Sequence, residues 1–143
     1  MSRPWRPFLS DRYIFVTVKV RKPRRRLGEG DFNRLASAMS RMRPKHRFLL
    51  TAGVFLPDHG HAIIYPPYPL TISRAMKAVK VSSMISLHQG RREAGELWQG
   101  RCFDRALRTV KEYLETVEYI PMNPVRPGRV KCAEEWKGSS VRE

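Results

Sequence analysis

Two histidines separated by a single residue, in the segment His59-Gly60-His61, are side chains whose type and spacing could do chemistry. Residues i and i+2 of a β-strand point to the same face of a sheet, so in a strand these two imidazoles lie side by side. Imidazole nitrogens bind divalent metals, and the end of a strand leaves room for the open coordination position that catalysis needs. The pair therefore predicts most of a metal site, with two surface histidines as the alternative.

A tyrosine and an asparagine lie one helical turn apart in the segment TVKEYLETVEYIPMNP. With about 100° of rotation per residue, this segment predicts a helix with an apolar stripe. The stripe consists of Val110, Leu114, Val117 and Pro121. Tyr119 is predicted on the opposite side of the helix, and Asn123 shares that side because it follows at i+4. Packing does not readily explain a tyrosine there, although a loosely packed surface aromatic is the alternative.

These side chains together suit the cleavage of a phosphodiester. A tyrosine hydroxyl is a competent nucleophile, but its pKa of about 10 leaves it neutral at pH 7. It then needs a base, or a phosphate that a metal ion has made electrophilic. Imidazole nitrogens and an amide oxygen are compatible with Mg²⁺ or Mn²⁺. The hypothesis is a site in which His59, His61 and Asn123 hold such an ion beside Tyr119.

The charge of the chain favours a polyanionic partner. Its 143 residues include 28 Lys and Arg but 13 Asp and Glu, a formal net charge of +15. Such an excess is typical of nucleic-acid binding, with a protein that is merely basic as the alternative. Trp98 is expected in the core rather than on bases. The candidate DNA-binding residues form a loop cluster, a helix row and a pair before the last helix: Arg21, Lys22, Arg24, Arg25 and Arg26; Arg74, Lys77 and Lys80; Arg105 and Arg108.

Several classes of protein are excluded by composition. The longest apolar stretch, Phe48–Leu56, is far shorter than the ~20 residues of a membrane-spanning helix. The segment Met1–Leu9 lacks the apolar core of a secretory signal. Cys102 and Cys132 form neither a disulfide framework nor a zinc-site spacing. We therefore expect a reduced, cytoplasmic protein with no membrane partner.

Local patterns predict strands and helices in alternation. Runs of β-branched and aromatic residues predict strands at Tyr13–Val20, Phe48–Leu56, His59–Tyr65 and about Cys102–Leu107. Apolar residues at helical spacing predict helices from Asp31 to about Met42, from Ile72 to about Leu87 and from Val110 to about Asn123, with Asp31, Thr71 and Thr109 as caps and Pro44 as the end of the first.

This order, β-α-β-β-α-β and a further helix, is that of an α+β, ferredoxin-like split β-α-β sandwich. An antiparallel sheet then carries helices on one face and leaves the other face free for chemistry or nucleic acid. The C-terminal helix bears the tyrosine. A chain of this length predicts one domain, residues 1–143, with a core at about 10–130, a basic N-terminal arm at 1–10 and a tail at 131–143.

Three segments, FLPDHGHAIIYP, LWQGRCFDRALRTVKEY and VEYIPMNPVRPGRV, occur in this order. They resemble the single-tyrosine HUH transposases, and among them the REP-associated tyrosine transposases. The resemblance spans about Tyr13 to Val130. It implies that His59 and His61 are metal ligands, that Asn123 is the third ligand, and that Tyr119 is the nucleophile.

The resemblance further implies a function. A metal-dependent enzyme, with Mg²⁺ or Mn²⁺, would cut and rejoin single-stranded, hairpin-flanked DNA through a 5′-phosphotyrosine intermediate. Its location would be the bacterial cytoplasm, in association with the nucleoid, and a monomer is favoured over a dimer. Two features depart from the family pattern: Gly60 stands where a bulky hydrophobic residue is usual, and the tail is short.

Three other functions stay open at this point. The first is a domesticated hairpin-DNA-binding protein with little or no cleavage activity. The second is a metal-dependent nuclease that uses water as its nucleophile and leaves no covalent protein–DNA product. The third is a small basic RNA-binding protein, for which a metal would be irrelevant.

Overall fold

The computed structural model describes residues 9–21, 27–91, 95–100 and 103–122. Residues 1–8 of the predicted arm, the predicted tail, both cysteines and Asn123 lie outside these ranges.

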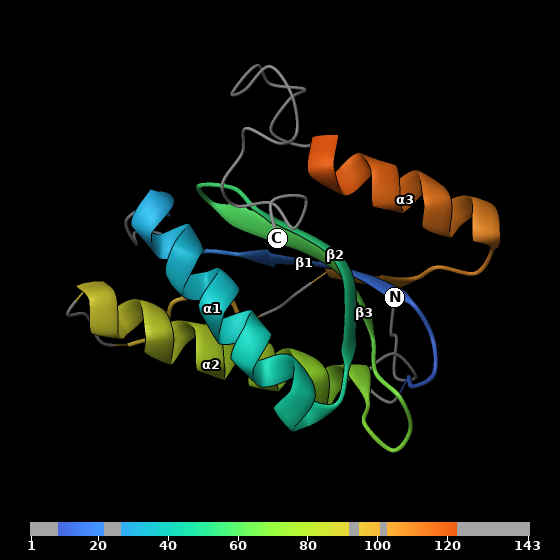
Figure 1. Ribbon diagram of the computed structural model, residues 1–143, viewed down its shortest axis with the longest axis horizontal. Coiled ribbons are helices and arrows are strands. Elements are labelled where there is room, and N and C mark those ends of the chain that lie inside the picture. The colour runs from blue at the N-terminus through green and yellow to red at the C-terminus, as the bar shows by residue number, and fades with distance from the viewer. Residues whose placement is uncertain (1–8, 22–26, 92–94, 101–102, 123–143) are drawn as a thin grey trace.

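The sheet has four strands in the order β2-β3-β1-β4. The strands are β1 (Ile14–Lys19), β2 (Leu49–Phe55), β3 (His59–Tyr65) and β4 (Phe103–Ala106). All neighbouring strands are antiparallel. With three helices between and after them, the predicted β-α-β-β-α-β order and the α+β class are confirmed (Figure 1).

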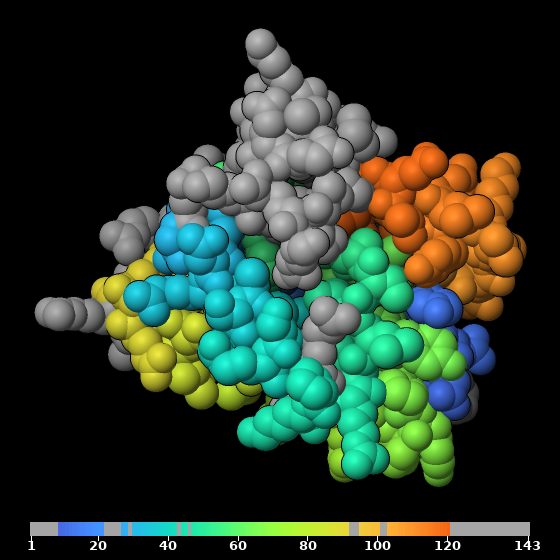
Figure 2. All heavy atoms as spheres, in the orientation of Figure 1, coloured from blue at the N-terminus to red at the C-terminus, as the bar shows by residue number. Residues whose placement is uncertain are grey.

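Helices cover both faces of this sheet. The helices α1 (Glu29–His46) and α2 (Ile72–Arg91) lie side by side on one face (Figures 1 and 2). Their apolar residues form one core with the β1 side chains Ile14, Val16 and Val18. The helix α3 (Val110–Met122) packs on the opposite face, over β2 and β3. The expectation that this second face stays open is therefore wrong for its β2–β3 half.

The start of α1 differs from the prediction. The helix begins at Glu29 after Gly28 as its N-cap, so Asp31 is not the cap but the third helical residue. Its Oδ2 accepts a hydrogen bond of 2.8 Å from the Gly28 backbone N–H. From within the first turn, Asp31 thus accepts the hydrogen bond of the N-cap backbone N–H, as the acidic residue of a capping box does.

The ends of α1 and α2 lie beyond their predicted positions. Pro44 lies inside α1, which continues to His46 and ends at Arg47 with φ 57. Proline removes one backbone donor, and in the last turn of a long, well-packed helix that loss does not end the helix. The second helix continues past Leu87 to Arg91, which forms an ion pair with Asp31 of α1, with Nη2 and Oδ2 2.8 Å apart.

Strand alternation decides which residues face the site. His61 and Ile63 of β3 pair with Thr17 and Phe15 of β1. Since Phe15 and Ile63 belong to the apolar cluster under α3, these pairs lie on the α3 face.

None of the described helices combines the length and apolarity of a membrane span.

Candidate active site

The two histidines begin β3 and lie on the same face of the sheet, as strand alternation requires. The ring centroids of His59 and His61 are 4.8 Å apart, with the ring planes at 76°. Both side chains are half-buried. The strand thus presents two imidazoles to one volume above the α3 face of the sheet.

A neighbouring oxygen orients each imidazole. Thr17 Oγ1, on the adjacent strand β1, shares a hydrogen bond of 2.8 Å with His61 Nδ1. His59 Nδ1 donates to the carboxylate Oδ1 of Asp58 at 2.7 Å. Metal-binding histidines commonly use one ring nitrogen for such an outer bond. In both residues Nε2 is then the nitrogen through which an ion would bind.

Burial keeps His61 neutral. Loss of hydration on burial and, as the smaller cause, the neighbouring His59 together lower the pKa of His61 from 6.5 to about 4. At pH 7 the His61 ring therefore carries a free lone pair instead of a second proton, which is the state that a metal ion requires.

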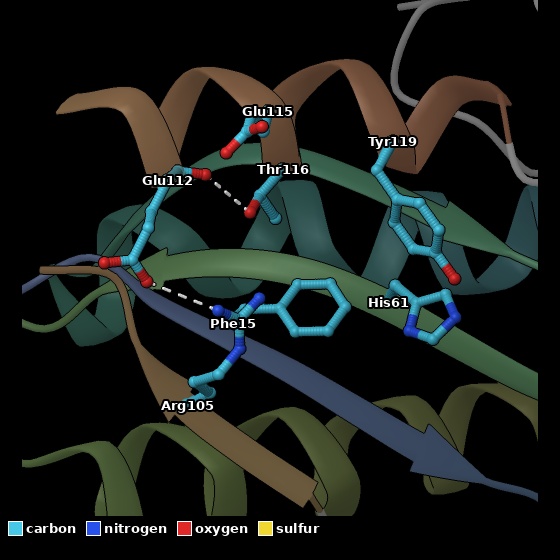
Figure 3. Close-up of a pocket in the computed structure, with 7 residues that line it drawn as sticks. All are labelled: Phe15, His61, Arg105, Glu112, Glu115, Thr116 and Tyr119. Atoms are coloured by element: carbon cyan, nitrogen blue, oxygen red, sulfur yellow. Dashed lines mark hydrogen bonds and ion pairs between the residues drawn. The ribbon is translucent and has the colours of Figure 1, made fainter. Parts of the chain in front are cut away.

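Tyr119 comes to this site from α3. Its ring centroid is 5.9 Å from that of His61 and 6.3 Å from that of Phe15. Phe15 in turn stacks on His61, with centroids 5.3 Å apart and the planes at 19°. In Figure 3 the tyrosine side chain points from the helix toward the imidazole on β3. Two aromatic rings thus hold the hydroxyl-bearing side chain beside the histidine strand.

The predicted apolar stripe of α3 is wrong at Val110 and Leu114, whereas its member Val117 does pack against the apolar cluster on the sheet. Val110 and Leu114 are 75% and 55% exposed, whereas Thr116 and Ile120 are buried. Thr116 can face the sheet because its hydroxyl donates to the Glu112 backbone carbonyl at 2.7 Å, which satisfies the buried polar group. The helix is therefore rotated from the predicted orientation. Tyr119 lies half-buried at the edge of the sheet-facing side, not opposite it.

A cavity of about 410 Å³ opens between α3 and the β1–β4 part of the sheet (Figure 3). Its lining comprises Phe15, His61, Arg105, Glu112, Glu115, Thr116 and Tyr119. Arg105 Nη1 and Glu112 Oε2 are 3.3 Å apart at its mouth. The cavity thus has the reactive side chains on one side and a cation on the other.

Sequence reasoning did not single out Phe15, Thr17 or Asp58. Alternation along Tyr13–Val20 could have placed Phe15 and Thr17 on one face of their strand. Their contact with His61 depends on the register between β1 and β3, which has no local signature.

The predicted basic residues are divided between the two faces. Arg105 lies at the cavity, and Arg108 is exposed just before α3. Arg74, Lys77 and Lys80 belong to α2, across the sheet from the histidines. Arg21 is ion-paired with Glu96. Of the remaining candidates, Lys22, Arg24, Arg25 and Arg26 lie outside the described residues.

Lys80 and Trp98 have structural partners. Lys80 Nζ donates to the Gln99 carbonyl at 3.0 Å, which anchors the segment before β4. Trp98 is 6% exposed, and its Nε1 donates to Ser83 Oγ at 2.9 Å. The prediction that Trp98 belongs to the core is confirmed.

Gly60, the residue between the histidines, is buried and points away from them. A Cβ at this position would lie 2.9 Å from Cδ1 of Phe55, its partner on β2. The phenyl ring therefore occupies the space that a side chain at position 60 would use. Phe55 packs against the core. It therefore covers the strand that carries the histidines on the face opposite to them.

The donor set suits a divalent metal ion. Two imidazoles converge, each with its Nδ1 held by an oxygen. Within the described residues, no cluster of three or more His, Cys, Asp or Glu side chains adds a further ligand set. Imidazole pairs of this kind fit Mn²⁺ and, with oxygen ligands and water, Mg²⁺.

Comparisons with known proteins agree with this fold. Residues 10–121 match a family model described as "Transposase IS200 like". An Escherichia coli K12 relative, a REP-associated tyrosine transposase, is 29% identical over 143 residues that cover 98% of this chain and 82% of the relative. A Haemophilus influenzae relative is 25% identical over 151 residues, covering 98% and 85%.

The fold also matches a solved structure, that of a REP-associated tyrosine transposase bound to a REP hairpin. The TM-score is 0.80 at 28% identity, over 99% of this chain and 84% of that chain. The resemblance drawn from the three sequence segments is confirmed.

Proposed function

Because the chain belongs to the IS200-like transposase family, we propose that it cuts and rejoins single-stranded DNA beside a hairpin, with Tyr119 as its nucleophile. The observation that supports this most is the placement of Tyr119 on α3 with its ring centroid 5.9 Å from that of His61 on β3. A nucleophile and a metal-binding imidazole from distant parts of the chain face one cavity.

The chemistry conserves the energy of the phosphodiester. The Tyr119 oxygen attacks the scissile phosphorus and forms a P–O bond to the tyrosine. The bond from phosphorus to the 3′ oxygen breaks, that oxygen takes up a proton, and the phenol proton passes to water. The products are a 5′-phosphotyrosine and a free 3′-OH. Attack by a different 3′-OH reverses the reaction and rejoins the strands without ATP.

His59, His61 and Asn123 would hold a Mg²⁺ or Mn²⁺ ion, which when bound polarises the scissile phosphate. Thr17 and Asp58 orient the imidazoles. Phe15 supports the rings of both His61 and Tyr119. Arg105, at the cavity, would contact the DNA backbone.

Hairpin DNA is the proposed substrate because a similar structure is that of a transposase bound to a REP hairpin. The net charge of +15 supports a nucleic-acid partner. We propose that the protein acts as a monomer, since Tyr119 already reaches His61 of its own chain, with ring centroids 5.9 Å apart.

The test is a cleavage assay on labelled single-stranded DNA that carries hairpins from the flanks of the protein's own gene. It is run with Mg²⁺, Mn²⁺ or EDTA, for the wild type and Tyr119→Phe, and read on a denaturing gel. We expect a metal-dependent covalent adduct that is absent from Tyr119→Phe, because only the phenol can form the link. Tyr113→Phe, on the same helix, is the matched control and should retain the adduct.

Two outcomes would overturn the proposal. Tight hairpin binding without an adduct in either metal would indicate a DNA-binding protein. Cleavage that persists in Tyr119→Phe would indicate water as the nucleophile.

A further inference from the structure

Among the described residues, those of α3 cover only half of the α3 face of the sheet. The helix packs over β2 and β3, whereas β1 and β4 form the floor of the neighbouring opening. Across this face the strand register aligns Phe103 of β4 with Thr17 of β1 and His61 of β3. The half-buried imidazole and an exposed aromatic ring therefore belong to one row of side chains.

Phe103 is the exposed member of that row, with 54% of its surface accessible. Neighbouring strands are about 4.8 Å apart, so positions two strands apart are separated by roughly 10 Å. A nucleotide whose phosphate lies at the histidines therefore has its own base, or that of its neighbour, within reach of Phe103.

Two cations lie on the same face as Phe103, and one of them, Arg105, is ion-paired with Glu112 of α3. Arg105, two residues along β4, belongs to the same face, and its guanidinium lies 5.8 Å from the Phe15 ring centroid. Lys19 is exposed and pairs with His59 on β3. An apolar ring flanked by cations is the arrangement by which single-stranded DNA is held, since bases stack on the ring while cations follow the phosphates.

We propose that Phe103 is the stacking platform for the base of a nucleotide next to the scissile phosphate. This inference rests on the proposed function and names a residue that positions its substrate. Stacking on a ring tolerates every base. Phe103 therefore contributes affinity and register, and leaves the choice of sequence to other contacts.

The test is a binding experiment in which cleavage plays no part. Full-length protein carrying Tyr119→Phe is titrated into fluorescent single-stranded DNA next to a hairpin, with one abasic site placed at each nucleotide in turn. Phe103→Ala and Phe103→Trp are compared in that background, and circular dichroism confirms folding. Tyr68→Ala is the matched control, because Tyr68 is 77% exposed but follows the end of β3 opposite His59.

We expect one position at which the abasic site weakens binding about tenfold. In Phe103→Ala the intact strand should bind about tenfold more weakly, and the abasic site at that position should cause no further loss. Phe103→Trp should restore both binding and the abasic effect, and Tyr68→Ala should behave as the parent.

The inference is overturned if Phe103→Ala binds as tightly as its parent. It is also overturned if, at every position, the loss of affinity from the abasic site is as large in Phe103→Ala as in the parent, so that the two effects are independent. It is also overturned if the folded parent does not bind the strand. An adduct missing from the cleavage assay, with the abasic coupling intact, overturns the cleavage chemistry and leaves the role of Phe103 standing.

Discussion

The two faces of the sheet differ in what their side chains do. On the α1–α2 face, Ile14, Val16 and Val18 are sealed under two helices in one apolar core. On the α3 face, a smaller apolar cluster around Phe15 and Ile63 lies beside the two histidines and the exposed Phe103. A single strand therefore contributes alternate residues to stability and to chemistry.

The comparison explains why the residue between the histidines belongs to the structural side. Gly60 faces the core and is covered by Phe55, while His59 and His61 face the cavity side. Changes on the first face should act on unfolding, and changes on the second face should act on metal and DNA.

The largest effect is expected on the structural face, at the ion pair between α1 and α2. The Arg91 side chain is 2% exposed and that of Asp31 is 15% exposed. Asp31→Asn removes the negative charge from its contact with the buried Arg91 guanidinium, which should lower the free energy of unfolding by about 3 kcal/mol. Urea denaturation measures this change.

The control for that prediction is the more exposed pair between Arg105 and Glu112. Glu112→Gln should lower the free energy of unfolding by less than about 1 kcal/mol. Equal effects of the two substitutions would contradict the division between the faces.

A second, smaller effect is expected at Gly60. A Cβ there would meet the Phe55 ring at 2.9 Å and the Val54 carbonyl oxygen at 3.3 Å. Gly60→Ala should lower the free energy of unfolding by about 2 kcal/mol, because it overpacks the back of β3. In a Phe55→Ala background the same change should cost about 1 kcal/mol less, which a double-mutant cycle measures.

Gly53→Ala is the matched control on β2, since its Cβ would have no neighbour nearer than 3.8 Å. It should leave stability almost unchanged. A Gly60→Ala protein as stable as Gly53→Ala would show that the phenyl ring moves aside freely.

The smallest effect is expected at Thr17, on the functional face. Thr17→Val keeps the shape of the side chain but removes the hydrogen bond of 2.8 Å to His61 Nδ1. The loss of this orienting contact should weaken Mn²⁺ binding about tenfold, equivalent to about 1.4 kcal/mol. Titration of the protein with Mn²⁺, read by the electron paramagnetic resonance of the free ion, measures it without reference to cleavage.

Thr51→Val serves as the control, because Thr51 is exposed on β2 at the irregularity between Leu50 and Ala52. Unchanged Mn²⁺ affinity in Thr17→Val would mean that packing against the neighbouring rings, and not this hydrogen bond, orients His61.

The sequence by itself determined what depends on near neighbours along the chain. Alternation placed His59 and His61 on one face of a strand, because side chains of a strand repeat every two residues. The order of strands and helices followed from the same local periodicities. The three motif segments identified the family.

Only the tertiary structure decided which face of α3 meets the sheet. The spacing of apolar residues predicted that Val110 and Leu114 face the sheet, but both are exposed. Thr116 is buried instead, with its hydroxyl bonded within the helix. Thr17 and Phe103 joined the row of His61 through strand register. Strand register and the rotation of α3 are set by packing between segments that are distant along the chain. Such packing produces no periodic pattern in the sequence from which it could be predicted.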